Sequence, residues 1–279
     1  MIGSHNSIGM LYNAQIGSET DIGGGRENQD DCFHFVKPEH GLIVAVMLDG
    51  HGREVGKIAA NSARQYLEKF CVDGLNLLLT DPKAWLIEAH NNAHYYIKQS
   101  FKTELEELGF ETMEDIAAGY LLKRKPNTQT WSCVHGGSSS TMLVLLKNNL
   151  YIANVGDSSA ILSTNYPVLT STCINYITDS ALSPTSPLAA LRGSLVSQYM
   201  ALNPDGEEPA KNTLVITAEH SPESPYEFYR LREFRARETD PNQPLLLVVY
   251  DSPSHEKPRC NPVFEVDEAG QATVTNQGK

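Results

Sequence analysis

The sequence lacks the cysteine patterns that stabilise small secreted proteins or bind zinc. Its cysteines are odd in number, widely separated and never arranged as Cys-x-x-Cys: Cys32, Cys71, Cys133, Cys173 and Cys260. Neither a disulfide framework nor a cysteine-ligated zinc site is therefore indicated. We expect reduced thiols, and with them an intracellular protein of the cytoplasm or nucleus.

Long apolar runs are absent as well. No stretch approaches the ~20 apolar residues that a membrane-spanning helix needs. Residues 1–20 contain neither a basic patch nor an apolar segment of signal-peptide length. Isoleucine at position 2 excludes the usual myristoylation signal. The sequence thus predicts no membrane partner.

Positive charge is scarce. The chain has 22 Lys and Arg against 34 Asp and Glu, a formal net charge of -12. Such a charge repels nucleic acid and anionic membranes unless basic residues gather on one face, so we expect no nucleic-acid partner. The 279 residues, 41% of them apolar, are enough for one large domain with a substantial core.

The most informative segment present is an apolar run, residues 41–48, that ends in Asp49-Gly50-His51-Gly52. The run predicts a buried strand, so the Asp49 carboxylate would be held at the end of a sheet, where it could bind a metal ion. The two glycines give access to backbone oxygens, and His51 is a proton carrier near neutral pH. Alone, this segment could equally be an ordinary Asp-Gly turn.

Two other segments have the same design. The apolar run 149–155 leads into Gly156-Asp157-Ser158, and the glycines at 23–25 lead into Arg26 and the acidic pair Asp30-Asp31. Three separate segments of the chain therefore end in carboxylates. Taken singly, Asp157 is almost as well explained as a turn residue, and Arg26 as the partner of Glu27 or Asp30 in a solvated ion pair.

In this order, the segments resemble the motifs of the PP2C (PPM-type) metal-dependent serine/threonine protein phosphatases. The matching segments are 26–31 (Arg-x-x-x-acidic-Asp), 49–52 (Asp-Gly-His-Gly), 137–144 (Gly-Ser-Thr strand), 153–158 (Ala-Asn-Val-Gly-Asp-Ser) and 217–222 (Thr-x-acidic-His-x-Pro). Each is short, but five in the correct succession are far more specific than any one. The resemblance spans roughly residues 12 to 236.

The resemblance implies an α+β fold with two antiparallel β-sheets packed as a sandwich and flanked by α-helices. We expect a single domain over 1–279, with a surface insertion at 165–212, where Ser, Thr and Pro replace periodic apolar residues. The family's later aspartates, in Gly-Asp, Asp-Gly and Asp-Asn contexts, have no counterpart before Lys279. The domain is thus expected to be C-terminally incomplete, and the protein to be monomeric.

Apolar periodicity predicts the positions of the main elements. Expected strands are 11–16, 31–36, 141–146 and 150–155, the last two forming a hairpin, with a second hairpin of 262–266 and 271–275. Expected helices are 53–71, a second one starting after Asp81-Pro82, and 224–237. His90 and His94 lie four residues apart on the second helix, where we expect a solvent-facing pair rather than a zinc site, because Asn91 replaces the glutamate of a His-Glu-x-x-His motif.

By resemblance, Asp49 bridges two Mg²⁺ or Mn²⁺ ions, the carbonyl of Gly50 completes one coordination shell, Asp30 serves the second ion, and Asp157 lies near a weaker third. Hard cations of this kind prefer such oxygen ligands. The missing later aspartates imply a weak or absent second site. Arg26 is expected to bind the phosphate through two parallel hydrogen bonds, and His51 to act as the general acid.

Two functions follow. The first is metal-dependent hydrolysis of phosphoserine or phosphothreonine in protein substrates by a metal-activated water. The second, favoured by the absent aspartates, is a catalytically impaired PP2C-like module that binds phosphoproteins or regulatory partners. Neither a Gly-x-x-x-x-Gly-Lys loop nor a Gly-x-Ser-x-Gly elbow occurs, which excludes the usual NTPase and serine hydrolase signatures.

Overall fold

The computed structural model describes residues 3–5, 14–22, 27–52, 54–115, 119–163, 213–217, 220–225, 227–231, 262–268 and 272–275. The chain divides into two compact units, residues 1–159 and 160–279. Arg26 with the glycines before it, the expected insertion at 165–212, and the end of the expected helix after residue 231 lie outside the described residues. The expected single domain over 1–279 stays a prediction.

The first unit is built on a four-stranded antiparallel sheet with the order β11-β10-β4-β3. Its strands are β3 (Asp31–Lys37), β4 (Leu42–Leu48), β10 (Ser140–Leu146) and β11 (Asn149–Val155). Strand β4 is central and is buried at five of its seven positions, as its Ile, Val and Leu content predicts.

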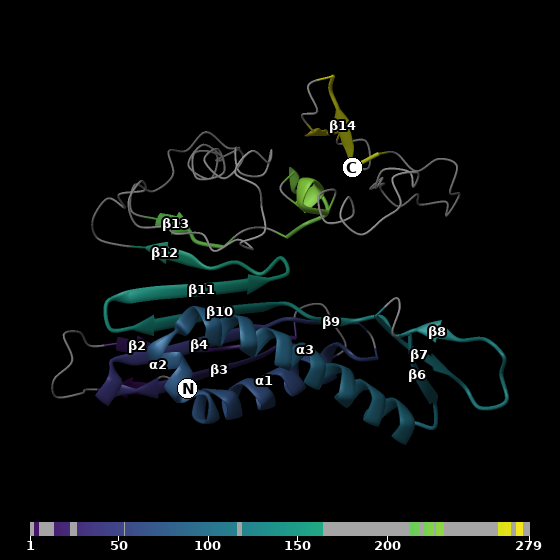
Figure 1. Ribbon diagram of the computed structural model, residues 1–279, viewed down its shortest axis with the longest axis horizontal. Coiled ribbons are helices and arrows are strands. Elements are labelled where there is room, and N and C mark those ends of the chain that lie inside the picture. Colours follow the sequence, from purple (N-terminus) through teal and green to yellow (C-terminus); the bar gives the residue numbers. More distant parts are fainter. Residues whose placement is uncertain are drawn as a thin grey trace. The chain divides into compact units, whose positions relative to one another are not determined.

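Three helices lie against one face of this sheet (Figure 1): α1 (Gly56–Asp73), α2 (Leu75–Thr80) and α3 (Pro82–Glu107). Helix α3 begins as expected, with Pro82 in its first turn and the Asp81 side chain accepting a hydrogen bond from the Ala84 amide at 3.0 Å. Helix α1 begins at Gly56 rather than at residue 53, and residues 54–55 before it form a turn.

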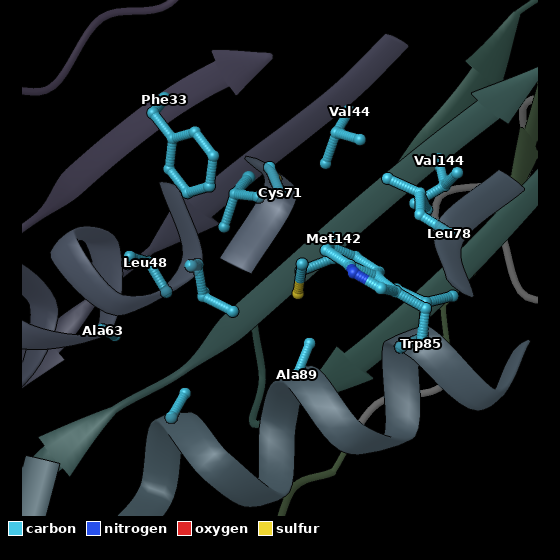
Figure 2. Packing of buried hydrophobic residues seen from close by; sticks show 14 of the residues in the cluster. Phe33, Val44, Leu48, Ala63, Cys71, Leu78, Trp85, Ala89, Met142 and Val144 are labelled. Carbon is cyan, nitrogen blue, oxygen red and sulfur yellow. The ribbon is translucent and has the colours of Figure 1, made fainter. Parts of the chain in front are cut away.

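The core of the first unit lies between this sheet face and the helices (Figure 2). Trp85 of α3 is fully buried, stacks on Phe70 of α1 with ring centroids 5.4 Å apart, and lies beside Met142 of β10. Burying one such large apolar side chain stabilises the fold by roughly 1.5–3 kcal/mol. The interlocked packing makes the central strands a rigid base for the loops at their ends.

Short strands extend the first unit beyond the main sheet. Strand β5 (Gly50–His51) pairs with β9 (Gly137–Ser138), and β6 (Glu111–Asp115), β7 (Tyr120–Arg124) and β8 (Ser132–Cys133) form a three-stranded sheet. Strands β1 (Gly3–His5) and β2 (Ala14–Ile16) form a separate pair, and the 3₁₀ helix η1 (Pro38–His40) connects β3 to β4.

The second unit contains two antiparallel pairs: β12 (Ile161–Ser163) with β13 (Thr213–Val215), and β14 (Phe264–Val266) with β15 (Ala272–Val274). Residues 225 and 227–231 are helical. Phe228 of this segment packs with Val263, Phe264 and Ala272 in a small apolar cluster. The expected tail hairpin and the start of the expected helix at 224 are both confirmed.

These elements confirm an α+β fold with antiparallel sheets flanked by helices. The packing of a second sheet on the free face of the main sheet stays a prediction. None of the helices within the described ranges is both long and apolar enough to cross a membrane.

The prediction that His90 faces solvent is wrong. Its imidazole points inward from α3, with Nδ1 2.8 Å from the carbonyl oxygen of Leu86 and Nε2 3.2 Å from the hydroxyl of Ser140 on β10. Because a carbonyl oxygen only accepts, Nδ1 carries the proton and Nε2 accepts from Ser140. His94 is exposed, as expected.

Candidate active site

The strand register brings three of the predicted carboxylates to one edge of the main sheet. Asp31 is paired with Leu48, so Asp30, just before the start of β3, and Asp49, just after the end of β4, are direct neighbours. Strands β10 and β11 run antiparallel, and Ser140 is paired with Val155. Gly156 and Asp157 therefore leave the sheet at the same edge, since the start of β10 lies beside the end of β4.

The carboxyl groups of Asp49 and Asp30 lie close enough for Asp30 to raise the Asp49 pKa. Although Asp49 is exposed as a whole residue, its pKa is raised above the ordinary 3.8, chiefly by partial burial of the carboxyl group. The negative charges of Asp30 and Asp157 act in the same direction, while His51 opposes them. A neighbouring negative charge and partial burial both disfavour the charged form of the Asp49 carboxyl group.

The segment after Asp49 is fixed by pairing with the start of β10. The Ser139 amide donates to the carbonyl oxygen of Asp49 at 2.8 Å, and β5 continues the pairing with Gly50 opposite Ser138 and His51 opposite Gly137. Gly50 is buried, whereas His51 is exposed. The His51 imidazole is thus presented to solvent beside the carboxylates, on a backbone held by strand pairing.

Asp157 is positioned by contacts that its two chain neighbours make with Ser139. Gly156 has a φ of +97° and packs so tightly on Ser139 that an added Cβ would lie 2.7 Å from the Ser139 Cβ. The hydroxyls of Ser139 and Ser158 are hydrogen-bonded at 2.6 Å, which ties the residue after Asp157 to the start of β10. The Gly-Ser pattern signalled a tight turn, but the Ser139–Ser158 pair only emerges once β10 and β11 are placed together.

Gln29 is a further residue that sequence reasoning missed. Its side-chain amide faces the carbonyl oxygens of Gly50 and Gly52, both acceptors, so the atom that faces them is the nitrogen. It donates to these oxygens over 3.1 Å and 3.3 Å. The close spacing of glycines at 50, 52 and 56 signalled that something approaches this turn, without identifying Gln29.

Residues 45–172, less than half of the 279 in the chain, match the sequence model of the family described as Protein phosphatase 2C. Over this segment the chain is similar to the PP2C phosphatases. No curated protein matches the sequence. The matched segment includes Asp49, Gly50, His51 and Asp157, whereas Arg26 and Asp30 lie before it.

The expected phosphate-binding arginine, Arg26, lies outside the described residues. Glu27, which the sequence offered as a possible ion-pair partner of Arg26, already has another cationic partner. The Glu27 carboxylate is 3.1 Å from Nζ of Lys57 on α1. Asp31 likewise has a partner, Arg64 of α1, at 3.0 Å. Helix α1 thus holds both flanks of the 27–31 segment.

The donor set at the sheet edge fits a hard divalent cation. The Asp30 and Asp49 carboxyl groups lie close together, and Mg²⁺ is commonly bound through one or two carboxylates while keeping several waters. Across the described ranges, no three His, Cys, Asp or Glu side chains are grouped closely enough to hold a metal by themselves. Backbone oxygen and water would have to supply the other ligands.

Proposed function

We propose that this chain hydrolyses phosphoserine and phosphothreonine in protein substrates with the help of Mg²⁺ or Mn²⁺. The observation that supports this most strongly is that the strand register makes Asp30 and Asp49 neighbours, with Asp157 and His51 close enough to change the Asp49 pKa. In a chain with a net charge of -12, such a concentration of negative charge at one sheet edge favours binding of a divalent cation.

Asp49, Asp30, the carbonyl oxygen of Gly50 and Asp157 are the residues that would hold the metal. When bound, the cation supplies a nucleophilic water near neutral pH and neutralises phosphoryl oxygens. His51, exposed on β5, donates a proton to the departing serine or threonine alkoxide. Arg26 binds the phosphate oxygens, because its guanidinium offers two parallel donors and keeps its charge.

A second candidate function is a catalytically impaired PP2C module that binds phosphoproteins or regulatory partners. It is favoured by one specific observation: among the described residues, no third metal-binding side chain is grouped with the neighbouring Asp30 and Asp49. A site with fewer anionic ligands binds a second ion weakly, and hydrolysis by a two-metal mechanism suffers accordingly.

The test is hydrolysis of an aryl phosphate and of a phosphothreonine peptide by the purified chain with Mn²⁺, with Mg²⁺ and with chelator. We expect turnover only with metal, and its loss by at least about 100-fold in Asp49→Asn. The matched control is Asp73→Asn, the same chemical change at the exposed end of α1.

Full turnover in chelator, or an Asp49→Asn enzyme as active as Asp73→Asn, would contradict the metal mechanism. A folded protein that binds Mn²⁺ and phosphopeptide without turnover would favour the binding module.

A further inference from the structure

The Gln29 side chain connects the segment that contains Asp30 to the segment that follows Asp49. Gln29 precedes Asp30 in the chain, and its side chain reaches the segment that follows Asp49. The main chain of Asp30 is itself fixed, because its amide donates to the side-chain oxygen of Asn28 at 3.0 Å. The Asn28 amide nitrogen in turn donates to the Thr20 hydroxyl at 2.8 Å. Gln29 therefore extends from an anchored segment.

The Gln29 side-chain amide makes two hydrogen bonds to the segment after Asp49. Its two N–H bonds are directed to the carbonyl oxygens of Gly50 and Gly52, which flank His51. A third hydrogen bond stabilises the same turn from the other side, since the Gly56 amide donates to the Gly52 carbonyl at 2.9 Å. The backbone from Gly50 to Gly52 is thus oriented from Gln29 and from the start of α1 together.

The space for Gln29 exists because two of its neighbours are glycines. A Cβ on Gly50 would overlap the backbone oxygens of Gln29 and Gly56, and a Cβ on Gly56 would overlap the Gln29 side chain. Gly50 and Gly56 therefore permit an approach that any other residue would prevent. This close fit leaves the amide little freedom to adopt another rotamer, so its donor geometry is preorganised.

We propose that Gln29 is a positioning residue that holds Asp30 and Asp49 side by side by binding the Gly50 and Gly52 carbonyl oxygens. It also orients the Gly50 carbonyl, and it leaves that oxygen one lone pair for another partner. The consequence for metal affinity rests on the proposed function, whereas the ordering of the 50–56 backbone does not.

The experiment compares Gln29→Met, which keeps the side-chain length and removes both donors, with Gln29→Glu, which keeps the shape and replaces the donors by acceptors. Gln65→Met and Gln65→Glu are the controls, because Gln65 is exposed on α1. Amide hydrogen exchange is measured on the metal-free proteins, and Mn²⁺ affinity is measured by calorimetry at equal folded fraction.

We expect the Gly56 and Ser139 amides, which bind the Gly52 and Asp49 carbonyls, to exchange about tenfold faster in both Gln29 variants, since two hydrogen bonds are lost. Exchange in α3 should not change. Mn²⁺ affinity should fall about 10- to 100-fold, the usual effect of removing a partner that orients a ligand. Gln29→Glu should bind Mn²⁺ no better than Gln29→Met, despite its added negative charge.

Wild-type exchange rates at Gly56 and Ser139 in both variants would overturn the inference, as would tighter Mn²⁺ binding by Gln29→Glu than by wild type. If the wild-type protein does not bind Mn²⁺, the proposed function is wrong. The amide exchange rates alone then test whether Gln29 positions the 50–56 backbone. Should Gln29→Met not fold, Gln29→Glu supplies both measurements.

Discussion

Asp49 is the residue at which the strand register, the electrostatics and the family match converge. Its position at the end of a buried strand is set by the apolar run before it, and its close contact with Asp30 follows from the pairing of Asp31 with Leu48. The raised Asp49 pKa is the electrostatic result of that contact and of burial. Like charges held this close to each other favour either a shared proton or a bound cation.

His90 is a second residue whose environment decides its charge. Burial lowers its pKa below the ordinary 6.5, and the hydrogen bond to Leu86 opposes this only in part. The folded protein therefore keeps the imidazole neutral, while the unfolded chain takes up a proton as the pH falls past about 6.5. The free energy of unfolding should decrease from there down to the lowered pKa of the folded state.

We predict that His90→Gln flattens this pH dependence, because Gln cannot be protonated. Urea unfolding at several values between about pH 7.5 and pH 5 measures it. His94→Gln, on the exposed side of the same helix, should retain the wild-type slope. Equal slopes in His90→Gln and wild type would contradict a neutral, buried His90.

The sequence predicts the positions of the site's carboxylates and glycines better than the role of its side-chain amide, Gln29. Asp49, Gly50 and His51 stand at a strand-to-loop junction that is visible in the apolar pattern. Gln29 was missed because its role depends on two carbonyl oxygens that the folded turn places 3.1 and 3.3 Å away. His90 was misplaced because its spacing from His94 does not reveal which side of α3 meets Ser140.

Among the elements, the pairing of β5 with β9 determines where His51 lies. Gly52 and Gly136 adjoin this pair with φ angles of +115° and +140°. A Cβ on Gly52 would lie 2.7 Å from the Gly136 Cα, and one on Gly136 would lie 2.6 Å from the His51 carbonyl oxygen. The two strands approach this closely only because both positions lack a side chain.

Gly136→Ala should therefore lower the free energy of unfolding by about 1–3 kcal/mol more than Gly109→Ala, in which only the backbone conformation disfavours alanine. It should also reduce phosphatase activity, because it displaces β5. Gly109→Ala is the control for that preference, since Gly109 has a φ of +84° and no atom within 4 Å of its added Cβ. Thermal or urea unfolding of both variants measures the difference. Equal stability losses would contradict the packing argument.

Helices and strands were predicted correctly where they are long and have a regular apolar pattern. The hairpin of β10 and β11, the central strand β4 and the capped start of α3 were predicted because each combines a clear period with a turn or cap residue. Helix α2 was missed because consecutive leucines at 77–79 show no helical period. Strands β6 to β8 were missed because polar contacts stabilise them, such as Arg124 with Glu111 at 2.5 Å and with the Trp131 ring at 4.5 Å.

For the whole molecule, the PP2C match and the main sheet concern the same part of the chain. Residues 45–172 include the second half of β4, the three helices, β10 and β11, whereas β3 lies before them. They supply Asp49, His51 and Asp157, while Asp30 is contributed by the segment just before the match. Sequence alone gave the order of these segments, but only the strand register shows that they share one sheet edge.

The proposed function depends on a divalent cation binding at that edge, and calorimetric titration of the folded, metal-free protein with Mn²⁺ tests this most directly. We predict measurable binding by wild type and by Asp73→Asn, and an affinity at least about tenfold lower in Asp49→Asn. Binding that is absent from the wild-type protein, or equally tight in Asp49→Asn, would contradict it.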